Sequence, residues 1–213
     1  LSGFFLLILI LESFGQGIDF YGKLNIGVGL NYNTLDYLGS NVIYSPGGGM
    51  GIELGVILPI NRVEAYFGLG YQQNLALQYE SSTYGGTNES SFRFNRKSLL
   101  GGAQYRYYFS NGTFRGVKVG GGINYNFPGN YRIVENNVEF GGISYKPALG
   151  YHIHVEFVLE IGGLTFVPGL RYRNILYSIK SYEKGEAIDL PSDLRRLKAS
   201  GIDISVAIIK NLN

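Results

Sequence analysis

The chain has 213 residues, which is enough for one domain with its own core, and no linker-like segment divides it. It contains 32 Gly, 18 Tyr and 13 Phe but no Cys, and only 16% of its residues are charged. This composition favours an all-β architecture and excludes disulfides and thiolate metal sites. Because the net charge is only +2, nucleic acid is not an expected partner.

The first segment, residues 1–16, is predicted to be a signal peptide. The run from Phe4 to Leu11 is uninterruptedly apolar. It is too short to cross a bilayer as a helix, but it suits the apolar region of an export signal. Small residues at Ser13 and Gly15 predict cleavage near Gly15 or Gln16. We expect a signal peptide that lacks its first residues, followed by one domain over 17–213; a buried strand is the alternative for the apolar run.

From Lys23 onward, apolar residues alternate with small or polar ones, as Leu24, Ile26 and Val28 do with Asn25 and Gly27 in the first segment. A period of two is typical of a strand with two different faces. It recurs in eight segments: 23–32, 49–58, 63–72, 98–109, 117–127, 142–153, 163–173 and 201–208. An even number of such strands predicts an eight-stranded antiparallel up-and-down transmembrane β-barrel.

The connections between these segments alternate in length. Residues 33–47, 80–95, 128–141 and 177–197 are long and polar, 59–62 and 110–116 are short, and the sixth turn falls within 154–162. This alternation is typical of a barrel with one elaborated rim and one plain rim. With the N-terminus in the periplasm, the long loops lie outside the cell.

Side-chain volume predicts which face is inside, because an eight-stranded barrel has an interior just wide enough for side chains. One face is bulky and apolar, while the other carries glycine at 27, 29, 49, 51, 55, 68, 70, 102, 120, 122, 142, 150, 163, 169 and 201. The glycine-rich face is therefore expected inside, and the apolar face is expected against lipid. Aromatic girdles are expected at both ends of this face: Tyr32, Tyr125, Phe127 and Tyr172 at one, Tyr107 and Phe109 at the other. Pro147 and Pro168 predict bulges or shifted strand boundaries.

Charged residues on the inward face are expected to form an ion-pair and hydrogen-bond network that fills the lumen, because an unpaired buried charge is costly. The predicted members are Glu53, Glu64 and Asp203 with Lys23, Arg106, Lys118, Lys146, Arg171 and Arg173. The alternative is a narrow pathway for small solutes, in which the basic surplus would favour anions.

Candidate catalytic or metal-binding chemistry is sparse. The two histidines, His152 and His154, are predicted to point to opposite faces of a strand, which would prevent them from binding one metal ion. Glu156 and Glu160 lie nearby, but no Ser occupies a recognisable nucleophile motif. We therefore expect no enzymatic activity, no metal and no cofactor.

The last long connection carries most of the clustered charge. Residues 191–198 are predicted to form a short helix capped by Ser192. Arg195, Arg196 and Lys198 are candidate contacts for lipopolysaccharide phosphates. The alternative is a solvated lid.

Three segments, KLNIGVGLNYN, VEAYFGLGYQQ and VKVGGGINYNF, resemble strands of the small outer-membrane β-barrel proteins of Gram-negative bacteria, the porin-family or OmpX/OmpA-like group. The closing SGIDISVAII resembles the last strand of such proteins, although Lys210 to Asn213 lacks a terminal aromatic residue. The resemblance implies a bacterial outer-membrane location and insertion by the barrel-insertion machinery. It also implies lipid and lipopolysaccharide as partners, with an envelope or surface protein as a further candidate.

Three functions remain open at this point. The first is a structural or surface-interaction barrel that acts through its long extracellular loops. The second is a narrow porin-like channel for small solutes. The third is a soluble lipocalin-like barrel, which would require the apolar face to point inward.

Overall fold

The structure is a computed structural model that describes residues 17–31, 33–37, 40–74, 78–83, 86–109, 112–135, 138–182 and 195–211. The predicted signal peptide, 1–16, lies outside the described residues. In the part of the chain that is described, no helix is long and apolar enough to cross a membrane.

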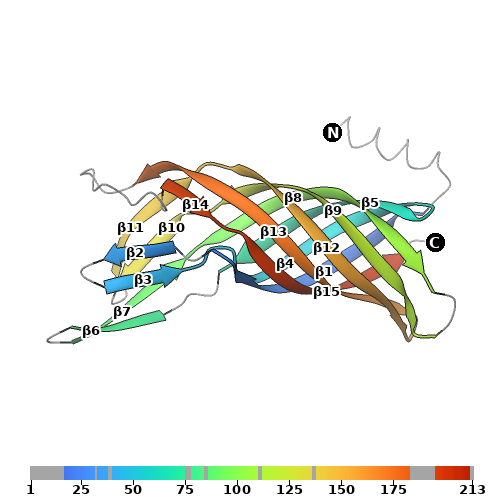
Figure 1. Ribbon diagram of the computed structural model, residues 1–213, viewed down its shortest axis with the longest axis horizontal. Helices are drawn as coiled ribbons and strands as arrows, with labels where there is room; N and C mark the ends of the chain where they lie inside the picture. The colour runs from blue at the N-terminus through green and yellow to red at the C-terminus, as the bar shows by residue number, and fades with distance from the viewer. Residues whose placement is uncertain are drawn as a thin grey trace.

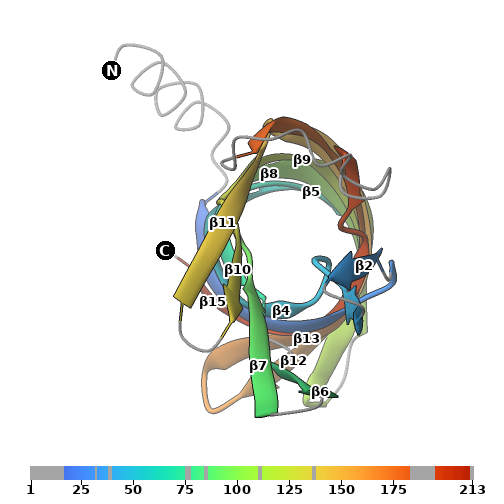
Figure 2. The same ribbon diagram turned by 90° about the vertical axis from the view of Figure 1, so that its left-hand side faces the viewer.

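Eight long strands form a closed antiparallel barrel, which Figure 1 shows from the side and Figure 2 from one end. They are β1 (Asp19–Gly29), β4 (Gly49–Ile60), β5 (Val63–Gln73), β8 (Asn95–Tyr108), β9 (Phe114–Pro128), β12 (Ala148–Ile161), β13 (Leu164–Tyr182) and β15 (Gly201–Asn211). Each pairs with its neighbours along the chain, and β1 pairs with β15 to close the ring. The predicted eight-stranded barrel is confirmed.

Short turns join the strands at one rim. The β4–β5 turn uses Asn61, with φ of 60°, and the β12–β13 turn uses Gly162 and Gly163, with φ of 59° and 79°. Two consecutive positive φ angles are typical of the two-residue hairpin turn that matches strand twist, and glycine adopts them without steric cost. This glycine pair places the sixth turn at the end of the range predicted for it.

The long connections at the other rim contain strands of their own. They are β2 (Asn33–Tyr37), β3 (Ser40–Tyr44), β6 (Gln78–Thr83), β7 (Gly86–Arg93), β10 (Tyr131–Glu135), β11 (Val138–Tyr145) and β14 (Arg196–Lys198). β2 and β3 form a separate hairpin, while β11, β10, β7 and β6 add in that order to the outer end of β13 (Figure 1). The sequence shows little apolar alternation there because these strands lie beyond the lipid-facing part of the barrel.

The structure corrects three local predictions, although it confirms the shifted strand boundary expected at Pro147. The expected strand over 142–153 is split, because β11 ends at Tyr145 and β12 begins at Ala148. Pro147 lies between them and cannot donate to a ladder, which explains the shifted boundary. Pro168, by contrast, lies within β13 and pairs with Val206 without a register shift.

The helix expected over 191–198 does not extend to Lys198: Arg195 is helical, but the helix prediction is wrong for the three residues that follow it. Residues Arg196 to Lys198 form β14, which pairs with β13. Leu197 is fully buried between exposed Arg196 and Lys198, so this segment has the period of a strand.

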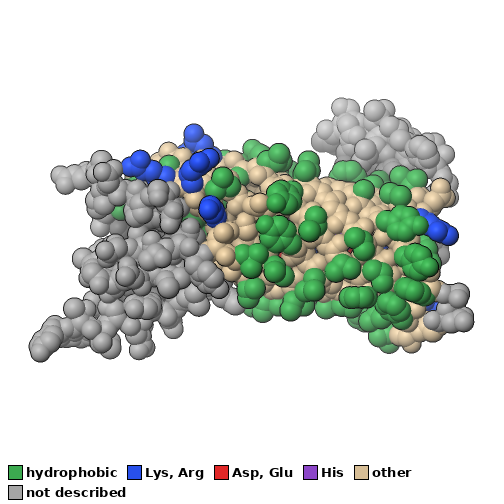
Figure 3. Space-filling view, viewed as in Figure 1, with side chains coloured by type: hydrophobic (Ala, Val, Ile, Leu, Met, Phe, Trp, Pro, Cys, Tyr) green, Lys and Arg blue, Asp and Glu red, His purple; other side chains and the backbone are tan. Residues whose placement is uncertain are grey.

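The apolar face points outward, as predicted. Leu54, Phe67 and Ile204 are 62%, 50% and 61% exposed. Together with the other outward side chains they form an apolar belt around the barrel, one face of which appears in Figure 3. Water does not tolerate so large an apolar surface, whereas lipid does. The soluble lipocalin-like alternative needs the opposite orientation and does not fit.

Glycines on the inward face make room for two large aromatic side chains. A Cβ atom added to Gly55 would lie 2.6 Å from Cε1 of Tyr21, and one added to Gly102 would lie 2.7 Å from Cζ of Tyr66. Both tyrosines are buried. The glycine-rich face is therefore filled by side chains that reach across from other strands.

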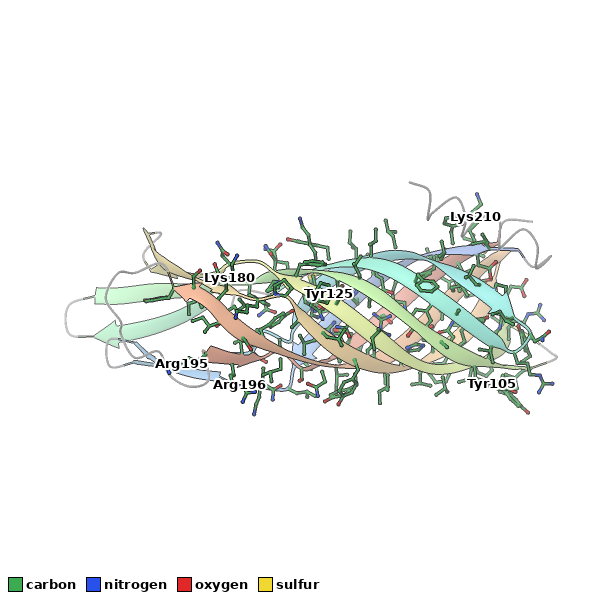
Figure 4. All side chains as sticks on the ribbon, turned by 90° about the horizontal axis from the view of Figure 1, so that it is seen from above. Tyr105, Tyr125, Lys180, Arg195, Arg196 and Lys210 are labelled. Atoms are coloured by element: carbon green, nitrogen blue, oxygen red, sulfur yellow. The ribbon has the colours of Figure 1, made fainter. Side chains whose placement is uncertain are left out.

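Aromatic pairs lie at both ends of the apolar belt. The rings of Tyr125 and Phe127 are 4.9 Å apart toward the long connections, and those of Tyr107 and Phe109 are 5.2 Å apart toward the short turns. Figure 4 labels Tyr125 of the first pair, and it labels Tyr105, an exposed aromatic residue of β8 near the short-turn end. Tyr172 packs on Tyr151 at 6.3 Å. The predicted girdle residue Tyr32 lies outside the described residues.

Candidate functional site

The lumen contains two clusters of buried apolar and aromatic residues, one toward each end of the barrel. A cluster of buried apolar and aromatic residues occupies the short-turn end: Tyr21, Ile57, Tyr66, Val167, Ala207 and Ile209. A second cluster occupies the long-connection end: Phe94, Ile143, Tyr145, Ile175, Tyr177, Leu197 and Ala199. Most charged and polar side chains of the lumen are buried as well, so their interactions are shielded from water and strengthened.

Glu53 of β4 anchors the middle of the lumen. Arg171 of β13 donates to both of its carboxylate oxygens, at 2.5 and 3.3 Å, and the Tyr21 hydroxyl donates to Oε1 at 2.7 Å. All three side chains are buried. The two-pronged contact matches the planar guanidinium to the planar carboxylate, which is the strong form of this interaction.

A second carboxylate, Glu64 of β5, collects donors from β8 and β9. Lys118 Nζ and Gln104 Nε2 each donate to Oε2 at 2.6 Å, and Arg106 Nη1 approaches Oε1 at 3.5 Å. Arg106 is 21% exposed and stacks its guanidinium on the ring of Tyr108, 4.3 Å from the centroid. Arg106 thus lies at the edge of the lumen, whereas Lys118 and Glu64 lie within it.

Two further buried ion pairs complete the charged layer. Lys23 Nζ donates to Glu156 Oε1 at 2.6 Å. Arg173 pairs with Asp203 and also donates to the carbonyl oxygen of Gly47 at 2.7 Å. The first pair joins β1 to β12 across the interior, and the second joins the neighbouring strands β13 and β15.

Lys146, predicted in the lumen, lies outside it. It follows β11, and its side chain is exposed, while its backbone N–H donates to Ser178 O at 2.8 Å. The prediction is wrong because Pro147 ends the strand that would have carried Lys146 into the barrel.

The prediction for the two histidines is also wrong. His152 and His154 both face the lumen, because residues two apart on a strand share a face. Their stacked rings are 6.0 Å apart. His152 Nε2 shares a hydrogen bond with the Tyr66 hydroxyl at 2.6 Å, and His154 Nε2 with Gln104 Oε1 at 2.8 Å. No group of three or more His, Asp or Glu side chains among the described residues is placed to hold a metal ion.

The lumen residues missing from the predicted network include Tyr21, Arg96, Gln104 and Glu156. Tyr21 and Arg96 lie two residues before the predicted starts of their strands, so continuing the period of two would have placed both inside. Glu156 falls in the range that was expected to contain a turn. Gln104 lies on the predicted inward face but carries no charge.

Little free space remains between these side chains. Two interior cavities measure about 20 Å³ each. A volume of this size holds about one water molecule. The opening that appears between the ribbons in Figure 2 is therefore largely filled, and this packing favours a plug over a solute pathway.

The outer surface carries a basic patch beyond the apolar belt, which we call the rim cluster: Lys146, Lys180, Arg195, Arg196 and Lys198. Lys146 and Arg196 both lie beside Ser178 of β13, one on each side. Figure 3 shows basic side chains at this boundary, and Figure 4 places Lys180, Arg195 and Arg196 at the same end of the barrel. Lys146, Lys180, Arg196 and Lys198 form no ion pair with any carboxylate whose side chain the structure describes.

The fold is similar to solved bacterial membrane proteins. Neisserial surface protein A is 9% identical, with a TM-score of 0.52 over 92% of this chain and 97% of that one. A major outer membrane protein from Thermus thermophilus is 15% identical, with a TM-score of 0.52 over 92% and 99%. OprG from Pseudomonas aeruginosa is 12% identical, with a TM-score of 0.51 over 92% and 97%. No family model and no curated protein matches the sequence.

Identities this low establish the fold alone. The fold is that of small eight-stranded outer-membrane barrels, and the belt of exposed apolar side chains is compatible with lipid rather than with water. The chain is therefore an integral β-barrel of the outer-membrane type.

Proposed function

We propose that the protein is a surface-interaction barrel that binds lipopolysaccharide phosphates through the rim cluster. The observation that carries the proposal is the convergence of five exposed cationic side chains at the outer edge of the apolar belt. Among the side chains that the structure describes, no carboxylate forms an ion pair with Lys146, Lys180, Arg196 or Lys198.

The rim cluster lies where lipid phosphates are expected. Along the outward face of β13, exposed Leu176 is followed by Ser178 and then by Lys180. Four residues of strand span about 13 Å, so apolar surface gives way to basic surface over roughly the depth of a headgroup region. Arginine and lysine bind phosphate through charge-assisted hydrogen bonds, while the belt below is compatible with acyl chains.

Neutralising two members of the cluster tests this function. The double variant Arg196→Gln, Lys198→Gln is expected to bind fluorescently labelled lipopolysaccharide at least about tenfold more weakly, since each lost charge-assisted contact contributes about 1 kcal/mol or more. Fluorescence anisotropy of the detergent-folded barrel at fixed salt measures the affinity.

The matched control is Arg62→Gln, Lys210→Gln, which removes two exposed cations near the short-turn rim. It should leave binding unchanged. Dephosphorylated lipopolysaccharide should bind wild type and the Arg196, Lys198 variant equally. If the two double variants bind the phosphorylated ligand equally well, the rim cluster is not the site.

The packed lumen leads to a separate expectation for conductance. Wild-type protein in planar bilayers is expected to give no steady ion current, because buried charged, polar and apolar side chains together fill the interior. Current traces over a range of voltages check this. Stable openings with anion selectivity would support the channel function instead.

A further inference from the structure

A small polar cavity lies in the outer half of the lumen, below the apolar cluster that contains Phe94 and Tyr177. Its volume is about 20 Å³. Besides Asn25 and Glu53, its walls include three guanidinium groups and three amides: Arg96, Arg171, Arg173, Gln72, Asn124 and Asn126. These six side chains are buried.

The charges around the cavity do not balance. Glu53 pairs with Arg171, and Asp203 pairs with Arg173. Arg96 has no carboxylate partner among the side chains that the structure describes, and it donates to the neutral Oε1 of Gln72. Three buried guanidiniums therefore face two carboxylates, and an uncompensated buried charge is strongly unfavourable.

Unused hydrogen-bond donors surround the same space. Arg96 Nη1, Gln72 Nε2, Arg171 Nε and Arg173 Nε are buried and have no protein partner. Buried polar groups are rarely left unpaired, so this group of donors indicates an acceptor that belongs to no protein side chain. The side-chain oxygens of Asn25, Asn124 and Asn126 also lack partners and would suit a water. The excess positive charge favours an anion over a water at the donors.

We propose that this cavity binds one small monovalent anion of halide size, held by Arg96, Gln72 and the Nε atoms of Arg171 and Arg173. One bound anion, added to the two carboxylates, gives three negative charges to balance the three guanidinium groups. The cavity admits a particle about as large as a water molecule, which excludes large organic anions. The site is independent of the rim cluster, since its residues point into the barrel rather than outward.

Chloride is the probe that tests the site. A ligand that binds only the folded state raises its stability with concentration. The unfolding midpoint of the folded barrel in detergent is expected to rise and saturate with sodium chloride, at an ionic strength held constant with sodium gluconate. In the variant Arg96→Gln the midpoint should not depend on chloride, whereas the control Arg62→Gln should behave as wild type.

Crystals of wild-type protein grown in bromide provide a second measurement, which does not depend on the folding of any variant. Anomalous scattering is expected within hydrogen-bond distance of Arg96 Nη1. Equal midpoints in chloride and gluconate, together with no anomalous peak in the cavity, would overturn the proposal and leave a bound water there. An undiminished chloride response in Arg96→Gln would place the anion elsewhere.

Discussion

Glu53→Gln is expected to lower the free energy of unfolding by about 3–5 kcal/mol, the cost typical of removing one partner from a buried ion pair. Arg171 would keep its charge in the interior without its carboxylate, and the Tyr21 hydroxyl would lose an ionised acceptor. Because the chain has no Trp, tyrosine fluorescence and the migration of the folded band report unfolding by urea in lipid vesicles.

The matched control is Glu160→Gln. Glu160 accepts from Arg115 at 2.5 Å, but both side chains are more than 40% exposed. An exposed pair of this kind contributes at most about 1 kcal/mol. Replacing both members of the buried pair, as in Glu53→Gln with Arg171→Met, should recover part of the loss. Equal losses for Glu53→Gln and Glu160→Gln would show that the central pair is hydrated rather than buried.

The barrel and the orientation of its faces could be predicted because both follow from local rules. Alternation between residues such as Leu54 and Glu53 needs only the period of a strand, and the inward direction needs only side-chain volume. Strand ends were less predictable. β13 continues to Tyr182, well past the range predicted for it, because pairing with β11 and β14 extends it beyond the lipid.

The sequence predicted most of the charged residues that lie in the lumen, but it did not predict which of them pair with each other. Glu53 and Arg171 are 118 positions apart, and their contact depends on registers that no local pattern fixes. The outward direction of Lys146 depends on Pro147 ending a strand within a segment that otherwise alternates. The period of two does place His152 and His154 on the same face, because residues two apart on a strand point the same way. The prediction was wrong because it assigned them to opposite faces.

Leu54→Arg is expected to destabilise the barrel in a bilayer by about 2–4 kcal/mol, the cost typical of a cation on the lipid face near the midplane. Leu54 lies midway along β4, pairs with Gly22 and Leu69, and is 62% exposed. In a water-soluble protein, the same change at so exposed a position would alter stability by only about 0.5 kcal/mol. Urea titrations in lipid vesicles therefore distinguish contact with lipid from contact with water.

Ile60→Arg is the matched control, because Ile60 lies on the same face of the same strand and is 57% exposed, but at the short-turn rim. Near the interface the cost of a cation falls to about 0–1 kcal/mol. Leu54 and Ile60 have similar exposed fractions, yet the loss of unfolding free energy on substitution by Arg should be several-fold larger at Leu54. Only surroundings that change from hydrocarbon to headgroups along the barrel produce such a difference. Equal effects at Leu54 and Ile60 would mean that the apolar belt does not contact a bilayer.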